Sequence, residues 1–172
     1  HPTTHAARGL LIEEGRTNYV KNSQFSGLTV GTNTTTGNWQ IAAGAIPSSS
    51  ITVTGTGTQN GIPYIDVRYN IPTNGTGSTQ WPNFGMAIAD AATVSNGTKT
   101  IFSSWFGVTS YTSTGGTCTV GYSNRSYTAA NAYIAEASNY FTATSPYTYQ
   151  TTPVMTHGAT AAKGYFFVYV TV

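Results

Sequence analysis

Charged side chains are scarce in this chain. They make up 7% of its 172 residues, whereas an average soluble protein carries roughly 25%. Its seven basic and five acidic residues give a net charge of +2, and the basic ones are spread too thinly to hold a nucleic-acid backbone, which needs clustered Lys and Arg. We therefore expect no nucleic-acid partner and expect hydroxyl and amide groups to provide the solubility.

Cysteine and long apolar runs are also lacking. The chain has one cysteine, Cys118, which excludes an internal disulfide framework and gives no metal-ligand spacing. Cys118 alternates with Thr117 and Thr119, so a buried, small apolar role is favoured over a reactive thiol. No apolar run approaches the roughly 20 residues of a membrane-spanning helix. We expect a protein that does not insert into membranes.

Ionisable groups suited to catalysis are few. A glycoside hydrolase needs two carboxyls about 5–10 Å apart, but Glu13 and Glu14 are neighbours in an extended segment and point to opposite faces. A Ser-His-Asp hydrolase needs a serine on a sharp turn, and the sequence has no Gly-x-Ser-x-Gly run. The remaining acids are Asp66, Asp90 and Glu136. We predict that the chain is not an enzyme.

The histidines leave one metal hypothesis open. Copper-dependent polysaccharide oxygenases hold copper with the amine and ring of an N-terminal histidine and with a second histidine, and imidazole suits copper. His1 with His157 or His5 would supply these ligands, although Pro2 follows His1 directly and no disulfide steadies the scaffold. A calcium site would need more carboxylates than the chain offers. We predict no metal or other cofactor and keep the oxygenase as a remote alternative.

What the sequence does contain is an all-β pattern. Thr, Ser, Gly and Asn separate short runs rich in Val, Ile, Tyr and Phe, as in proteins built from many short strands. In PYIDVRYNI, residues 64–71 alternate between a polar and an apolar set, which is the period of a half-buried strand. Two packed antiparallel sheets in a jelly-roll arrangement are the simplest architecture. The other expected strands lie near residues 49–54, 99–109, 117–122, 147–157 and 164–172.

Two of the expected strands are apolar on both faces. The runs IFSSWFGV and YFFVYVTV are typical of central strands that are covered on each side. The best helical candidate is the segment 128–138, because its alanines favour a helix, and a loop crossing one end of the sheets is the alternative.

The run GLLIEEGRTNYVKNSQF (9–25) resembles a segment of bacteriophage tail-fibre, tail-spike and head-fibre proteins, in which Gly-Leu-Leu-(Val/Ile)-Glu-x-x-x-Thr-Asn enters a domain like a carbohydrate-binding module. Trp39 stands where such modules have a tryptophan, and the later strands match them more loosely, so that the resemblance covers most of the chain. It implies an N-terminal connecting and assembly segment at 1–20 and a jelly-roll-like antiparallel β-sandwich at 21–172. The matching residues are Gly9, Leu10, Leu11, Ile12, Glu13, Thr17, Asn18, Asn22, Ser23 and Phe25.

The charges of this run predict an assembly contact. If several copies pack around a common axis, Glu13 or Glu14 would meet Arg8 or Arg16 of a neighbour. Such ion pairs would fix the register of the subunits and add little to the free energy of association, since exposed pairs contribute roughly 0–1 kcal/mol. The alternative is an intrachain or solvated pair. The expected partners are other copies in a homotrimer and other virion proteins. The chain ends at Val172 within its last expected strand, which indicates a fragment or a terminal module.

The resemblance and the polar surface together predict sugar binding. In sugar-binding sites of β-sandwich proteins, aromatic rings pack against the apolar faces of pyranoses, and polar side chains around the rings form hydrogen bonds with the sugar hydroxyls. Trp81, flanked by Gln80 and Asn83, is the best platform candidate. Trp39 and Trp105 lie in strand-like runs and are expected to be buried. The predicted strand face comprises Tyr64, Asp66, Arg68 and Asn70. Further rings are Tyr111, Tyr127, Tyr147 and Tyr149, and for each of them a half-buried ring with its hydroxyl in water is the alternative.

These observations predict a non-enzymatic module on the virion surface that recognises host-surface polysaccharide. The alternative is a structural fibre knob or capsid-decoration domain that binds no sugar.

Overall fold

The computed structural model of the protein describes residues 24–44, 46–72, 82–112, 118–142 and 148–171. These residues form an all-β structure with one short 3-10 helix, η1 (Ile88–Asp90), and no α-helix occurs among them. Every strand pair is antiparallel. The strands are β1 (Trp39–Ala42), β2 (Ser50–Gln59), β3 (Ile62–Asn70), β4 (Asn83–Met86), β5 (Ala92–Thr93), β6 (Lys99–Thr100), β7 (Ser103–Phe106), β8 (Thr119–Tyr127), β9 (Tyr133–Thr142), β10 (Thr148–Thr151), β11 (Met155–Thr156) and β12 (Lys163–Thr171).

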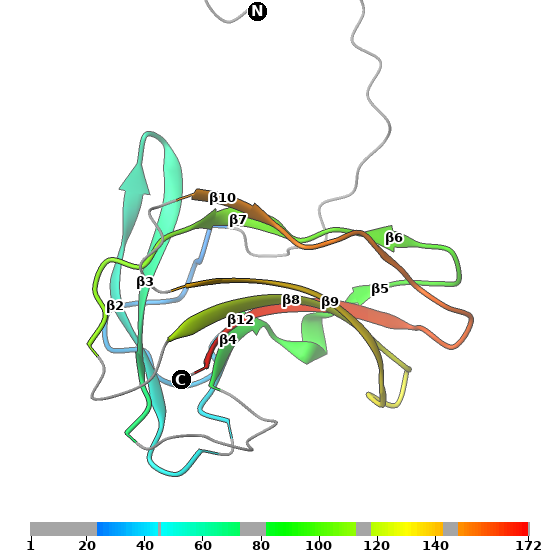
Figure 1. Ribbon diagram of the computed structural model, residues 1–172, viewed down its shortest axis with the longest axis horizontal. Helices are drawn as coiled ribbons and strands as arrows, with labels where there is room; N and C mark the ends of the chain where they lie inside the picture. The colour runs from blue at the N-terminus through cyan, green and yellow to red at the C-terminus, as the bar shows by residue number, and fades with distance from the viewer. Residues whose placement is uncertain (1–23, 45, 73–81, 113–117, 143–147, 172) are drawn as a thin grey trace, which may run out of the picture.

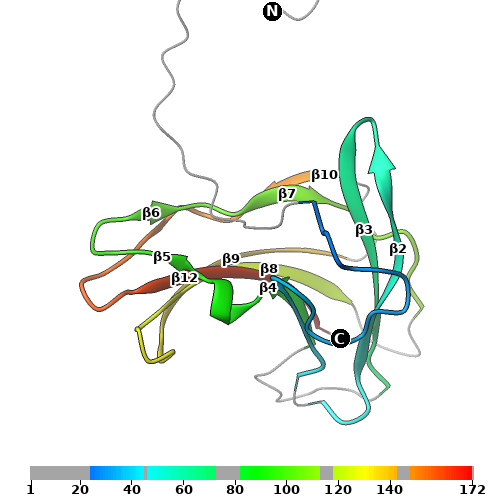
Figure 2. The same cartoon turned by 180° about the vertical axis from the view of Figure 1, so that it is seen from behind.

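The strands form an antiparallel β-sandwich. The largest sheet has the order β1-β4-β12-β8-β9, with β5 also paired to β12, and three further pairs are β7 with β10, β6 with β11, and β2 with β3. In Figure 1, β6, β7 and β10 lie as one layer above the six-stranded sheet. The β2–β3 hairpin stands across one end of both layers, and the view from behind in Figure 2 shows the same arrangement. A jelly-roll order of the strands stays a prediction.

The main core lies between the layers and beneath the hairpin. Trp39 stacks on Phe84 with ring centroids 5.1 Å apart, and Phe102 stacks on Phe166 at 3.9 Å, which joins the upper layer to the large sheet. Trp39 is 4% exposed, so its predicted burial is confirmed. The other buried members of this core are Leu28, Ile41, Ile51, Val53 and Met86.

A second, smaller core contains the single cysteine. Cys118 is buried against Val120 and Val170, as the alternating sequence predicts. Burial raises the pKa of its thiol above the ordinary value, because the charged thiolate is poorly solvated there. Cys118 therefore packs as a small apolar side chain and is not an activated nucleophile.

Of the two strands expected at the centre of the sandwich, one is central. β12 lies between β4 and β8 and buries residues of both faces, including Phe166 and Phe167. The prediction for IFSSWFGV is wrong, because β7 pairs only with β10 among the described strands and leaves Trp105 half exposed. A run of apolar residues does not show whether a layer exists to cover its second face.

The helix expected at 128–138 is absent, and the segment is a turn followed by β9. Thr128 closes the turn, since its backbone N–H donates to the Ala132 carbonyl (2.9 Å) and its hydroxyl accepts from the Ala132 N–H (3.1 Å). Asn131 takes a positive φ of 65° there. Along its length β9 then pairs with β8, apart from a register shift between Ser126 and Tyr127. The local helix preference of alanine is a few tenths of a kcal/mol per residue at most, and this ladder outweighs it.

Candidate functional site

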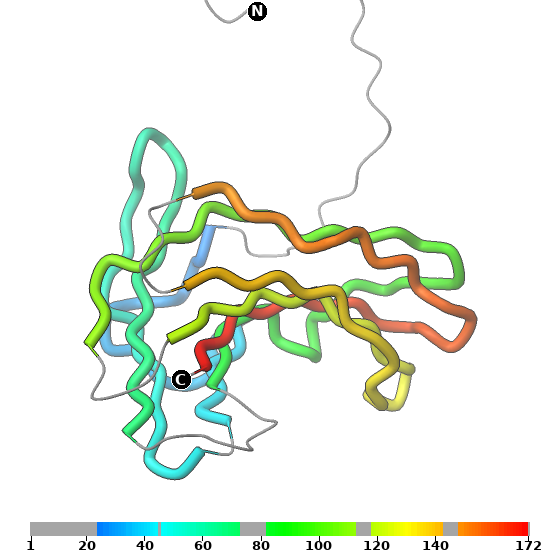
Figure 3. Tube along the Cα trace, viewed as in Figure 1, coloured from blue at the N-terminus to red at the C-terminus, as the bar shows by residue number. Residues whose placement is uncertain are grey.

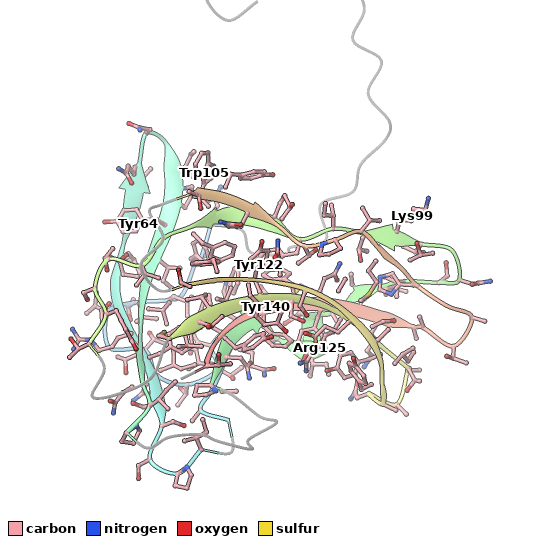
Figure 4. All side chains as sticks on the ribbon, viewed as in Figure 1. Tyr64, Lys99, Trp105, Tyr122, Arg125 and Tyr140 are labelled. Atoms are coloured by element: carbon pink, nitrogen blue, oxygen red, sulfur yellow. The ribbon has the colours of Figure 1, made fainter. Side chains whose placement is uncertain are left out.

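The polar face predicted for residues 64–70 lies on the β2–β3 hairpin. Asp66, Arg68 and Asn70 are exposed and Tyr64 is half-buried, while the alternate residues Ile65, Val67 and Tyr69 pack against the main core. The predicted alternation is therefore confirmed, and the structure brings four of the predicted residues together. We call Tyr64, Asp66, Arg68 and Asn70 the hairpin face; Figure 4 labels Tyr64 on it.

A tight turn and a hydrogen bond fix the hairpin in place. Asn60 and Gly61 join β2 to β3 with φ values of 53° and 79°, the two positive angles of a type I′ turn, whose twist fits a two-residue hairpin. On the core side, the Tyr69 hydroxyl donates to the Val168 carbonyl of β12 (3.0 Å). Burial raises the pKa of Tyr69, so the phenol stays protonated and keeps this bond. The hairpin face is thus presented by a rigid element.

Two glycines of β2 let side chains of the hairpin face lie close to the backbone. Gly57 is paired with Tyr64 and Gly55 with Asp66. A Cβ at Gly57 would lie 2.9 Å from the Tyr64 ring, and one at Gly55 would lie 2.5 Å from the Asp66 carboxylate. The Tyr64 ring and the Asp66 carboxylate therefore lie directly against the β2 backbone, because Gly57 and Gly55 have no side chains there.

Asp66 and Arg68 have no partner among the residues that the structure describes. In the described part of the chain, neither side chain has a hydrogen bond or an ion pair to another residue. No ion pair between Asp66 and Arg68 is present, so both side chains keep their hydrogen-bonding groups exposed. An exposed carboxylate supplies acceptors only and a guanidinium supplies donors only, so the two together match a ligand that carries both.

A cleft of about 370 Å³ opens beside the hairpin face, between β3, the segment 106–111 and residues of β8 and β12. Exposed polar residues lie along its rim, among them Asp66, Arg68 and Ser110, with the predicted ring of Tyr111 (40% exposed). Its floor is apolar and includes Val108. Ligand sites are commonly clefts of about 300–1,000 Å³ with few polar groups on an apolar base, and this cleft has that build at the lower end of the range.

The other predicted site residues are not gathered at the hairpin. Asn83 lies on β4 in the six-stranded sheet, where its side-chain oxygen accepts from the Gln40 amide (3.2 Å). Tyr127 is buried and its hydroxyl is 3.2 Å from that of Tyr165, so it offers no open ring. Outside the described residues lie Gln80, Trp81 and Tyr147 of the sugar-binding set, Glu13, Glu14 and Arg16 of the assembly set, and His1 and His5.

The sequence misplaced one tryptophan. Trp105, expected to be buried, is 50% exposed and lies opposite Tyr149, which is 55% exposed. Its neighbour Phe106 points inward and stacks on Tyr122 with centroids 5.4 Å apart, so the two-residue period of β7 places Trp105 on the outer surface. The same period puts Phe102, Ser104 and Phe106 on one face of the strand and Trp105 on the other. This spacing is the sequence signal that could have located Trp105 correctly.

The six-stranded sheet carries an ion pair that the sequence did not reveal. Arg125 of β8 and Glu136 of β9 are Cα partners, and their side chains meet at 2.5 Å. The Arg125 guanidinium also lies 4.4 Å from the centroid of the Phe167 ring. Burial alone would lower the pKa of Arg125, but Tyr127 and the Glu136 carboxylate raise it, so the guanidinium stays charged. Figure 4 shows Arg125 on the side of the sheet opposite Tyr122.

His157, the residue considered as a second copper ligand, is built into the interior. It is 1% exposed; its Nδ1 lies 3.0 Å from the Ser126 hydroxyl and its Nε2 lies 2.9 Å from the Thr100 hydroxyl. The Thr100 hydroxyl also accepts from the Asn124 amide (2.9 Å). Both ring nitrogens are engaged in this arrangement. Among the described residues, no group of three or more His, Cys, Asp or Glu is placed to hold a metal ion.

The buried His157 predicts that stability falls in mild acid. Burial lowers its pKa below the ordinary value of 6.5, so the unfolded chain takes up this proton at a higher pH than the folded chain. The stability that neutral His157 contributes is complete above about pH 6.5 and is lost as the pH falls towards the folded pKa. Urea denaturation at several pH values measures it. A His157→Gln variant is expected to show a shallower dependence, and an identical pH profile in both proteins would contradict the prediction.

In comparisons with known proteins, no family model matches the chain, and neither a curated protein nor a solved structure is significantly similar to it.

Proposed function

We propose that this chain is a non-enzymatic module of a bacteriophage fibre or spike that binds host-surface glycan through the hairpin face. The observation that carries the proposal is the pair Asp66 and Arg68, which are exposed, line the cleft and have no partner among the described residues. The similarity of residues 9–25 to phage fibre segments supports the virion context. The module would act outside the cell, on the virion surface, with other copies of itself and other virion proteins as partners.

The chemistry of the hairpin face fits a sugar. The Asp66 carboxylate can accept from adjacent hydroxyls, and the planar Arg68 guanidinium can donate to hydroxyl oxygens or to an acidic substituent. Tyr64, resting over Gly57, offers an apolar surface to sugar C–H groups. Such an open site binds weakly by itself, and a trimer would raise the apparent affinity for a repeating polymer by multivalency.

Binding without turnover is proposed because the hairpin face carries a single carboxylate. Glycosidases place two carboxyls on either side of the scissile bond, and Asp66 is the one acid of this face. Glu136, on another sheet, is held by Arg125 and by the Ser138 hydroxyl. These surroundings support recognition more than hydrolysis.

The alternative function is a structural knob or capsid-decoration domain. The exposed apolar side chains of Ile62, Ile101 and Val154, each more than half exposed, favour it, because neighbouring subunits of a fibre cover such groups.

Neutralising the hairpin face is expected to abolish most glycan binding. Asp66→Asn and Arg68→Gln should each weaken binding to a host-envelope polysaccharide by at least about tenfold, since hydrogen bonds to charged groups contribute about 1.5–3 kcal/mol. Isothermal titration with purified envelope polysaccharides measures the change, and Trp81→Ala tests the predicted platform in the same series.

The matched control is Lys99→Gln, which removes the same charge as Arg68→Gln. Lys99 is exposed on β6 at the end of the molecule away from the hairpin (Figure 4). Equal weakening by both variants would mean nonspecific attraction to an anionic polymer. No binding of the unmodified protein to any envelope polysaccharide would favour the structural alternative.

A further inference from the structure

A second surface with different chemistry lies on the outer side of the β7–β10 layer. Phe106 faces Tyr122 of the six-stranded sheet, so the alternate residues Ser103 and Trp105, with their cross-strand partners Thr151 and Tyr149, lie on the outer side; we call these four residues the β7–β10 face. Trp105 and Tyr149 are 50% and 55% exposed. Neither strand contains a charged residue. The surface therefore combines two open aromatic rings with hydroxyl groups and carries no charge of its own.

The two rings form an open pair. Trp105 and Tyr149 are direct cross-strand partners, with ring centroids 5.6 Å apart and planes inclined by 58°. Rings at this inclination do not cover one another, so each keeps an accessible surface. The Tyr149 hydroxyl forms no hydrogen bond within the described residues and is free to exchange hydrogen bonds with a ligand.

The inward side of the same strands holds this pair rigidly. Phe106, next to Trp105, stacks on Tyr122 and packs near Phe141 with centroids 6.3 Å apart. The Tyr122 hydroxyl lies 3.1 Å from the Gln150 side-chain oxygen and 3.0 Å from the Thr151 carbonyl. β7 and β10 are thereby tied to the large sheet on both sides of the aromatic pair. A surface that is already ordered loses little conformational entropy when a ligand binds.

We propose that the β7–β10 face is a second carbohydrate site, specific for neutral pyranose units. The apolar faces of a pyranose carry C–H groups that pack on the electron-rich faces of aromatic rings, while its hydroxyls meet Ser103, Thr151 and the phenol of Tyr149. The absence of charge on both strands selects a neutral sugar, in contrast to the charged hairpin face. This inference goes beyond the proposed function, because it assigns another ligand chemistry to another sheet and is tested separately.

A neutral oligosaccharide fits the face better than a second copy of the chain does. The aromatic pair is flanked by Ser and Thr hydroxyls, and an inclined pair of rings presents a stepped surface. The successive rings of a sugar chain, rotated relative to one another, can follow such a step. Association of two copies through this face is nevertheless a distinct outcome of the experiment.

The test is a titration of the full chain with neutral glucose oligomers in α-1,4 and β-1,4 linkage and a neutral mannose oligomer, followed by NMR of the tryptophan indole N–H signals. Trp105→Phe assigns the Trp105 signal. We expect that signal to move with at least one oligomer, and we expect Trp105→Ala and Tyr149→Ala each to weaken the binding by about tenfold, equivalent to about 1.4 kcal/mol. Tyr133→Ala is the matched control, because Tyr133 on β9 is exposed to a similar degree (57%).

Asp66→Asn and Arg68→Gln separate the two sites. They are expected to leave neutral-oligomer binding within about twofold of the unmodified protein, so a failure of the hairpin proposal would not be mistaken for a failure of this one. The proposal is overturned if no neutral oligomer moves the Trp105 signal, or if Tyr133→Ala weakens binding as much as Tyr149→Ala does. It is also overturned if sedimentation shows that Trp105→Ala dissociates an oligomer, because the face would then be a subunit interface.

Discussion

Replacing Trp39 with alanine is expected to lower the free energy of unfolding by about 3–5 kcal/mol, the usual cost of removing a large buried ring. Trp39 is 4% exposed, and its indole contacts rings from three parts of the chain: Phe25 (4.8 Å), Phe84 (5.1 Å) and Phe166 (6.1 Å between centroids). The cavity would open where β1, β4 and β12 meet. Urea denaturation of the purified variant measures the loss.

Trp105→Ala is the matched control for Trp39→Ala. It removes the same indole from a position that is 50% exposed, and its expected cost is about 1 kcal/mol, because half of this residue's surface stays in water in the folded state. Equal costs for the two variants would contradict the placement of Trp39 in the core.

Gly85→Ala is expected to destabilise the protein by about 1–3 kcal/mol or more. Gly85 lies on β4 beside β12, and a Cβ there would lie 2.4 Å from the Phe166 carbonyl oxygen and 2.5 Å from the Phe167 Cα. Both atoms belong to the backbone, so the added methyl group would force two central strands apart. Thermal unfolding followed by circular dichroism measures the shift.

Gly158→Ala provides the corresponding control. Among the described residues, nothing lies within 4 Å of a Cβ at Gly158, and its φ is outside the positive region. The alanine there should be neutral or raise stability slightly by reducing the freedom of the unfolded chain. If both alanine variants unfolded at the same temperature, the close contact of β4 with β12 at Gly85 would be wrong.

Parts of the fold were predictable because strand periodicity is a local property. In residues 64–71 each second side chain points to the same face, so the sequence alone separated Asp66 and Arg68 from Val67 and Tyr69. The same alternation places Cys118 in a core, whereas β12 was expected in the interior because its run is apolar on both faces. The exposure of the hairpin face depends only on this alternation and could therefore be predicted from the sequence, whereas its role in binding stays a prediction.

Other parts depend on partners that are distant in the sequence. β4 is only four residues long and contains a glycine, and it exists as a strand because it fits between β1 and β12. The path in Figure 3 shows how far the chain travels between these neighbours. Segment 128–138 favours a helix or a loop locally, and pairing of β9 with β8 overrides this preference. No local pattern encodes such pairings.

The missed side-chain features follow from these missed pairings. Arg125 and Glu136 are eleven positions apart and become neighbours only once β8 and β9 are known to form a hairpin. Trp105 was assigned to the interior because its run was apolar throughout, although the layer that contains β7 has nothing packed on its outer side among the described strands. Exposure of a strand face is set by the number of layers, which the sequence of that strand does not contain.

The most direct test of the proposed function is to incubate the purified chain with host-envelope polysaccharide and to measure two quantities in the same sample. Co-sedimentation gives the fraction of protein held by the polymer, and size-exclusion chromatography gives the length of the polymer. We predict that the protein is retained, that Asp66→Asn and Arg68→Gln release it, and that the polymer keeps its length. Shortening of the polymer, or no retention of the unmodified protein on any envelope polysaccharide, would contradict a module that recognises glycan without turnover.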